Sequence, residues 1–285
     1  MQKRTERYHN NYKTVVIKKT RLRPWAFFLF LIFFSSILFI SCFIFFDWTK
    51  DNKDIEKIEE KIEEAVKPIE KNEEGVLVNP PEDKKSDYWY YINLPFYEVD
   101  FTELLKKNPD TVAFIHVPNT NINYPIVQAN DNDYYLTHAF DKSKNSAGWV
   151  YIDYRNSNSF SDDNTIVYGH GRLNKTVFGS LKDTLTKDWQ NNKENYVIQI
   201  STPTTNFVYQ IFSIYTIDAE GYYITPRFAT TSAKEEWLTI MKSRNTAPID
   251  VSLNASDKII TLSTCQNNSG GRIVVQGKLI KQQVK

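Results

Sequence analysis

The sequence predicts a mostly β domain with a few helices, built from eight strands and preceded by a single N-terminal transmembrane helix. Two observations predict this fold class. From about residue 86 to the C-terminus, short runs of β-branched and aromatic residues are separated by turn residues. Near the N-terminus, a stretch of 23 residues carries no charge. Eight short strands divided by turns favour a closed barrel or a sandwich over alternating βαβ units.

The composition excludes several function classes. The 285 residues include 35 basic and 34 acidic side chains, so the near-neutral chain lacks the basic balance of a nucleic-acid-binding protein. Two cysteines are too few for a disulfide scaffold or a four-cysteine zinc site. Four histidines leave little material for a metal centre. We therefore expect no metal centre.

The uncharged stretch, residues 24–46, is long enough to cross a membrane. As a helix it would measure about 34 Å, which matches the hydrocarbon core of a bilayer. Residues 1–23 hold eight basic residues and one acidic residue. The positive-inside rule predicts that this basic tail is cytoplasmic and that everything after the anchor is extracellular. The expected location is the cell membrane, with a single pass.

Two other interpretations of this stretch fit less well. A cleaved signal peptide would have a shorter apolar region followed by a small-residue cleavage site, and large apolar residues follow Cys42 instead. The same bulky neighbours, with Phe39 and Ile40 in front, argue against Cys42 as a lipoprotein cysteine. We interpret the stretch as an uncleaved anchor.

Residues 47–85 are expected to form a charged helical stalk and a linker. Apolar residues recur there at helical spacing, at Ile55, Ile58, Ile62, Val66 and Ile69. This seam fits either a short coiled coil or, as we favour, a solvated helix lying against the domain, and it does not decide whether the stalk dimerises. Pro68 should disturb the last turn. Residues 75–85 resemble a linker.

Residues 86–285 should form the extracellular domain. The predicted strands cover residues 112–117, 122–127, 149–153, 165–168, 196–200, 207–217, 258–263 and 272–280. The predicted helices cover residues 101–108, 177–185 and 232–243. Ser232 is the expected N-cap of the last helix.

Cys265 is the candidate nucleophile of this domain. It follows the apolar run of residues 259–262, so it should fall just past the end of a buried strand. A reactive cysteine needs a base or a positive charge nearby, and a buried structural thiol is the alternative. Arg272 opens the next strand after turn-forming residues, so a hairpin should place it within reach of Cys265. An arginine there can donate two hydrogen bonds to a carbonyl or a developing oxyanion.

His170 is the candidate acid–base residue. It lies at the end of a short apolar strand between Gly169 and Gly171, where the backbone should be tight and irregular. His116 alternates within a strand and is interpreted as a packed or half-exposed sheet residue. His138 lies in a tyrosine-rich segment and is interpreted as a hydrogen-bonding residue of the core. Asn267 and Asn268 are expected to be turn residues and not members of a catalytic triad.

Together these segments resemble the sortases, membrane-anchored cysteine transpeptidases of Gram-positive bacteria. The resemblance lies in TLSTC (residues 261–265), YGH (168–170) and GRIVVQGKL (271–279). NINYPIVQANDNDYYLTHAF (121–140), AGWVYIDYRN (147–156) and VFGSL (177–181) are similar to class B members. The resemblance implies an eight-stranded sortase-type barrel. It also assigns the nucleophile to Cys265, the histidine to His170 and the arginine to Arg272, and places Ser263 beside bound substrate.

The resemblance further implies the reaction and its partners. Class B sortases cleave a C-terminal signal similar to Asn-Pro-x-Thr-Asn on exported surface proteins and transfer the threonine carbonyl to a cell-wall peptidoglycan precursor amine. The partners are then sorting-signal-bearing proteins, that amine and the membrane, without nucleic acid. The reaction that the resemblance implies needs no metal or organic cofactor. A pilus-type sortase, which joins pilin subunits, is the alternative within the family. Gln266 stands where some relatives have an acidic residue, so the sequence does not support an acidic third catalytic member.

Two rival functions remain open from the residues alone. A hydrolase would use the same three side chains and resolve the acyl-enzyme with water. A non-catalytic, membrane-anchored cell-wall binding module would need none of them, and its function would survive Cys265→Ala. A papain-like protease is a much weaker alternative, because its characteristic cysteine motif and downstream histidine are absent.

Overall fold

The computed structural model describes residues 24–66, 68–72, 74–265 and 271–285. The chain divides into two compact units, Met1–Asp47 and Trp48–Lys285. The predicted basic tail, residues 1–23, lies outside the described residues. Helix α1 (Pro24–Ala65) begins in the first unit. The large apolar side chains of this first part of the helix are exposed. In the described part of the chain, α1 is the one helix long and apolar enough to be a candidate membrane span.

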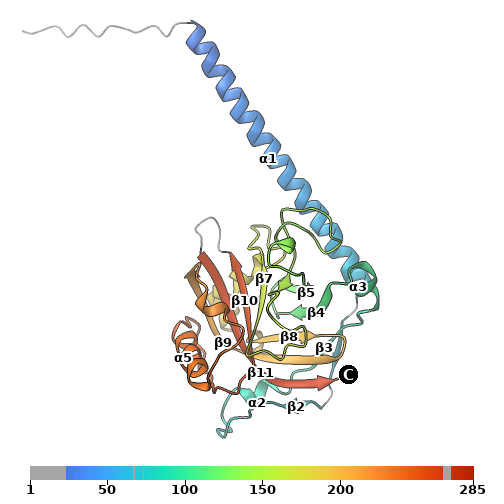
Figure 1. Cartoon of the computed structure of the whole chain (residues 1–285), viewed down its shortest axis with the longest axis vertical. Helices are drawn as coiled ribbons and strands as arrows, with labels where there is room; N and C mark the ends of the chain where they lie inside the picture. Colours follow the sequence, from blue (N-terminus) through green and yellow to red (C-terminus); the bar gives the residue numbers. More distant parts are fainter. Residues whose placement is uncertain (1–23, 67, 73, 266–270) are drawn as a thin grey trace, which may run out of the picture. The chain divides into compact units, whose positions relative to one another are not determined.

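The second unit is built around a closed β-barrel of eight strands (Figure 1). The strands are β4 (Thr111–His116), β5 (Asn123–Val127), β6 (Tyr151–Ile152), β7 (Asn164–Gly169), β8 (Val197–Ser201), β9 (Thr205–Asp218), β10 (Ile259–Cys265) and β11 (Gly271–Val284). Their order is β10-β7-β6-β5-β4-β8-β9-β11, and the pairing of β10 with β11 closes the ring. The predicted barrel is therefore present.

All eight predicted strands are found, and most of their ends lie within a few residues of the prediction. The largest shortening is at residues 149–153, where the ladder is reduced to β6. Trp149 and Val150 are fully buried, but the N–H of Trp149 donates to the carbonyl of Tyr135 in a neighbouring loop. The apolar character of Trp149 therefore reflects core packing, whereas Val150 still bonds to β5, because its carbonyl accepts a hydrogen bond from the N–H of Val127 at 3.2 Å.

Two of the helix predictions need correction. The predicted helix at residues 177–185 is present as a shorter 3₁₀ helix, η2 (Gly179–Leu185). Val177 lies outside it, because its left-handed backbone (φ 54°) cannot be part of a right-handed helix. Helix α5 (Thr231–Ser243) is capped by Thr230 and not by Ser232. Thr230 is extended, and its hydroxyl accepts a hydrogen bond from the N–H of Ala233 at 3.1 Å. Helix α3 (Thr102–Lys107) lies where it was expected.

The segment expected to be a linker is partly ordered as a strand. Strand β2 (Val76–Leu77) pairs with the outer edge of β11. Strand β1 (Ile69–Lys71) pairs with β3 (Phe96–Glu98) in a separate small sheet. The remaining short elements are α2 (Tyr88–Tyr91), η1 (Tyr134–Leu136), α4 (Lys187–Gln190), η3 (Lys193–Asn195) and η4 (Tyr222–Ile224).

The charged end of α1 packs against the barrel. We call Trp48–Ala65, the part of α1 within the second unit, the docked segment. Ile55 and Ile62 are buried in the main hydrophobic core, as is Val66 just beyond the helix, and Ile58 packs on it. Ile69 has left the helix and is exposed in β1. The apolar seam seen in the sequence therefore faces the barrel, and the helix ends before Pro68.

Candidate active site

Three neighbouring strand ends bring the predicted site residues to one edge of the barrel. Strand β10 runs parallel to β7 and antiparallel to β11, and the three lie side by side (Figure 1). Thr264 of β10 is level with Gly169 of β7, and Cys265 is paired with Arg272 of β11. Cys265 and His170 each follow the Thr264–Gly169 pair by one residue. The parallel pairing of β7 with β10 brings His170 next to the predicted hairpin.

Cys265 is positioned by its backbone, as the residue at the end of β10. Arg272, opposite it, is half-buried, and its Nη1 donates to the carbonyl of Gly271 at 3.0 Å. The connecting residues, which include Gln266 and the predicted turn residues Asn267 and Asn268, lie outside the described residues. The register confirms the predicted hairpin and the neighbouring strand ends.

A pocket of about 400 Å³ opens at this edge. His170, Arg272 and Ser263 all line it, so it contains three of the four predicted site residues. Its other lining residues are Asn132, Asp133, Leu136, Tyr151, Tyr168, Gly169, Ala219, Glu220, Tyr223, Ile224 and Thr264. The volume suits an extended peptide segment of a few residues or a small organic group.

The ring of His170 is held by the loop that carries η1. Its Nε2 lies 2.9 Å from the carbonyl oxygen of Leu136. A carbonyl only accepts, so Nε2 must carry the proton, and Nδ1 is the nitrogen left for proton exchange. The ring is also crowded, because a Cβ added at Gly148 would lie 3.0 Å from His170 Cδ2. His170 is therefore a half-buried side chain with a defined orientation.

The other two described histidines lie outside the pocket. His116 is half-buried in β4 and stacks on Tyr97 with ring centroids 4.4 Å apart, as expected for a packed sheet residue. His138 bonds through Nδ1 to the carbonyl of Tyr134 at 2.8 Å and stacks on the Tyr134 ring. Its predicted hydrogen-bonding role is confirmed, but it is half-buried and not in the core.

A buried carboxylate supports one wall of the pocket. Asp153 is fully buried and accepts hydrogen bonds from Arg155 (2.7 and 2.8 Å), Tyr168 (2.8 Å) and Asn132 (3.1 Å). Burial alone would raise the pKa of Asp153, but the hydrogen bonds from Arg155 and Tyr168 outweigh it and lower the pKa. The ionised carboxylate thus fixes two residues that line the pocket, Tyr168 and Asn132.

The pocket also contains residues that were not predicted. Ser263 Oγ lies 2.9 Å from the hydroxyl of Tyr223, and both side chains are buried. Tyr223 comes from η4, in the long connection between β9 and α5, and Leu136 comes from η1. No local pattern marks these residues, although Leu136 lies within the tyrosine-rich segment already noted. In the parts of the chain that the structure describes, no group of three or more His, Cys, Asp or Glu side chains could hold a metal.

Comparisons with known proteins agree on one family. The family model described as the Sortase domain matches residues 115–280. The sortase B of Listeria monocytogenes is 37% identical over 184 residues, which cover 64% of this chain and 74% of that protein.

Solved structures of sortase B complexes are also similar to this chain. A Staphylococcus aureus sortase B–substrate complex has a TM-score of 0.59 and 31% identity, covering 64% of this chain and 84% of that one. A sortase B complexed with triglycine has a TM-score of 0.60 and 31% identity, covering 64% and 85%.

Proposed function

Because this chain belongs to the sortase family and is a class B cysteine transpeptidase, we propose that it cleaves a C-terminal sorting signal of exported proteins at a threonine carbonyl. The signal resembles Asn-Pro-x-Thr-Asn, and the acyl group passes to a cell-wall peptide amine. The observation that carries the proposal is the convergence of Cys265, His170 and Arg272 at three adjacent strand ends, beside a pocket of about 400 Å³.

In the first half of the reaction, the Cys265 thiolate attacks the threonine carbonyl carbon. A C–S bond forms, and the carbonyl oxygen becomes an oxyanion. When this intermediate collapses, the C–N bond to the next residue breaks, and His170 gives the leaving amine its proton. Because Nε2 of His170 is engaged with Leu136, the transferred proton is the one on Nδ1. The products are a thioester on Cys265 and a free C-terminal fragment.

In the second half, the acceptor amine attacks the thioester. His170, now neutral at Nδ1, removes the proton from the attacking nitrogen. A new amide bond forms, the C–S bond breaks, and the thiolate of Cys265 is regenerated. Attack by water at the same carbon would release a free acid, so hydrolysis is the expected side reaction.

Arg272 stabilises the negative charge that develops on the carbonyl oxygen in both halves of the reaction. Its guanidinium lines the pocket and starts from the residue opposite Cys265. A planar, permanently charged group can donate two hydrogen bonds to the oxyanion or the substrate carbonyl, where negative charge forms. Such a contact is stronger in the transition state than in the ground state, as catalysis requires.

The same pocket is the proposed site for the sorting signal. Ser263 and Tyr223 line it with a pair of bonded hydroxyl groups, and Leu136 and Ile224 supply apolar surface. The substrate and triglycine complexes of related sortases support the idea that enzymes of this kind bind both a substrate and a peptide amine. We place the N-terminus in the cytoplasm and the barrel outside the cell, beside membrane-tethered substrates, because the charge bias of residues 1–23 favours that orientation.

The test uses the full chain in detergent micelles with a fluorogenic Asn-Pro-Gln-Thr-Asn peptide. Cleavage is followed with and without triglycine or a stem-peptide amine, beside Cys265→Ala, and the products are identified by mass spectrometry. Cysteine-dependent cleavage with an amide-linked product supports the proposal. Release of free acid alone under every amine would favour a hydrolase, and a Cys265→Ala variant that still cleaves would refute the assigned nucleophile.

A further inference from the structure

The docked segment contacts both loops that touch His170. It presents Asp51, Asn52 and Glu59 on the face that also buries Ile55, at helical spacing. One loop, residues 145–148, lies against the His170 ring. The other, residues 171–178, follows His170 directly in the sequence. Each loop is bonded to the docked segment, directly or through one tyrosine.

The first loop is held by Asp51. The carboxylate of Asp51 accepts hydrogen bonds from the backbone N–H of Ser146 at 3.0 Å and from the Ser146 hydroxyl, and its carbonyl accepts from Asn145 at 3.0 Å. Gly148 of the same loop has a left-handed backbone (φ 60°) and leaves no room for a side chain beside His170. A shift of this loop would therefore move or release the imidazole ring.

The second loop is folded back on His170 itself. The carbonyl of His170 accepts hydrogen bonds from the N–H groups of Arg172 and Phe178, both at 3.1 Å, and Gly171 forms a bridge with Val177. Val177 is buried with φ 54°, a conformation that a β-branched residue does not adopt without external support. The loop needs partners outside itself to keep this shape.

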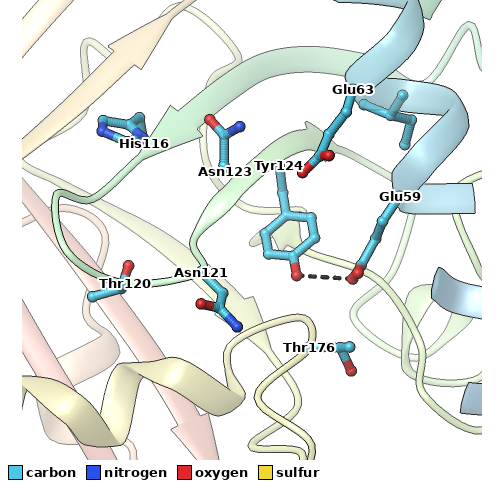
Figure 2. A pocket seen from close by; sticks show the side chains of 9 residues that line it. Glu59, Glu63, His116, Thr120, Asn121, Asn123, Tyr124 and Thr176 are labelled. Atoms are coloured by element: carbon cyan, nitrogen blue, oxygen red, sulfur yellow. Dashed lines mark hydrogen bonds between the residues drawn. The ribbon is translucent and has the colours of Figure 1, made fainter.

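Those partners lead to the docked segment. The N–H of Val177 donates to the hydroxyl of Tyr124 at 3.0 Å, and that hydroxyl donates to Glu59 at 2.8 Å (Figure 2). At the other end of the loop, Arg172 donates to the side-chain oxygen of Asn52. Two hydrogen-bonded connections, which reach the loop at Arg172 and at Val177, therefore link the backbone around His170 to one helix face.

We propose that the docked segment positions the imidazole of His170, with Asp51, Asn52 and Glu59 as positioning residues that act through the loops of residues 145–148 and 171–178. This inference rests on the proposed function, in which His170 is the acid and base. This role explains why the residues between the apolar stretch and the barrel form an ordered helix that packs on the core. A simple tether would need only sufficient length.

Glu59 makes the connection sensitive to pH. It borders a cavity of about 380 Å³ that Glu63, His116 and Tyr124 also line (Figure 2). Burial raises the pKa of Glu59 to about 7, the hydrogen bond from Tyr124 partly offsets this, and Glu56 and Glu63 raise it further. Burial also lowers the pKa of His116 and raises that of Tyr124, so neither brings a neutralising charge at pH 7. The buried position of Glu59 in the docked segment therefore favours its neutral, protonated form.

The experiment compares variants of the full chain in detergent. Asn52→Ala and Glu59→Ala remove the two connections, whereas Asn52→Asp and Glu59→Gln keep an acceptor oxygen for Arg172 and Tyr124. Glu60→Gln, on the exposed side of the same helix, is the matched control. We expect the alanine variants to lower kcat by roughly tenfold with KM within about twofold, as for a misplaced acid–base group. The conservative variants should restore kcat.

The pH profile supplies a readout that a purely structural helix would not alter. Gln mimics protonated Glu59, so Glu59→Gln and the parent should have equal kcat near pH 5. The ratio of variant to parent should rise roughly threefold by pH 8, because only the parent then buries a charge. A ratio that stays constant, or alanine variants that retain full kcat, would overturn the proposal.

A second measurement separates this inference from the proposed function. The imidazole signals of His170 can be followed by NMR in histidine-labelled chain and assigned with His170→Gln. Asn52→Ala and Glu59→Ala should broaden or shift them, and Glu60→Gln should not. If the parent cleaves no sorting peptide, the proposed function fails while the signals still report on positioning. Imidazole signals that stay unchanged in both alanine variants would refute the proposal that the docked segment positions His170.

Discussion

Cys265 and Arg272 form the last cross-strand pair in the described part of the β10–β11 ladder. In an antiparallel ladder such partners lie directly opposite each other on neighbouring strands, so the register alone brings residues 265 and 272 together. Strand β7, on the other side of β10, ends in Gly169 and is followed by His170. The chemistry proposed here depends on this meeting of three strand ends.

Arg272→Lys should lower kcat/KM for the sorting peptide by about a hundredfold, the usual cost of losing one oxyanion donor. A lysine keeps the charge but cannot reproduce the planar pair of donors. The measurement is steady-state cleavage of the Asn-Pro-Gln-Thr-Asn peptide. Arg227→Lys, at an ion pair with Asp162 away from the pocket, is the control and should retain most activity. Turnover of Arg272→Lys close to that of the parent would remove Arg272 from its assigned role.

Gly148→Ala should destabilise the protein by about 2 kcal/mol or more, because alanine is strained at positive φ and its Cβ has no space. The added atom would lie 2.5 Å from the carbonyl oxygen of Tyr135. Gly221→Ala is the matched control, since nothing lies within 4 Å of its added Cβ. Thermal unfolding compares the two variants. An unchanged midpoint for Gly148→Ala would show that the loop beside His170 yields easily.

Glu59→Gln should flatten the dependence of stability on pH. The pKa of Glu59 is raised from 4.5 to about 7 in the folded chain. Its stabilising contribution is therefore fully present below pH 4.5 and is lost as the pH rises to about 7. Relative to the parent, the variant should gain about 2–3 kcal/mol of unfolding free energy between pH 5 and pH 8. Denaturant titrations at both pH values, with Glu60→Gln beside them, test this, and a parallel response of all three chains would contradict it.

Ser263→Ala and Tyr223→Phe should separate substrate contact from structure. Each change removes one partner of the 2.9 Å hydroxyl pair, so each should cost about 1 kcal/mol of stability. If Ser263 also contacts the substrate, its variant should raise KM several-fold more than Tyr223→Phe does. Equal KM values in the two variants would limit Ser263 to a structural role.

A fragment starting at Ser86 should be much less stable than one starting at Trp48. The shorter fragment lacks Ile55, Ile62 and Val66, which are at most 4% exposed in the intact unit. Each such side chain contributes roughly 1.5–3 kcal/mol when buried. Thermal unfolding and peptide cleavage of both fragments test this. Equal midpoints would mean that the docked segment adds little to the domain.

The sequence by itself determined the class of the fold, the candidate membrane span and the Cys265–Arg272 pair. These features depend on local signals: strand-forming runs, an uncharged stretch of sufficient length, and a short turn between two strands. The apolar seam of residues 55–66 was visible for the same reason. The sequence did not show which surface covers that seam, because an amphipathic helix buries its apolar face equally well in a coiled coil or on a barrel.

The tertiary structure alone decided how His170, Leu136 and Tyr223 meet the hairpin. Cys265 lies 95 residues after His170 in the chain, and their proximity comes from the parallel pairing of β7 with β10. Parallel strands are not joined by a tight turn, so no local sequence signal indicates that they pair. The left-handed Val177 and its support by Tyr124 and Glu59 were equally hidden, because strain at one residue is maintained by contacts that other elements supply.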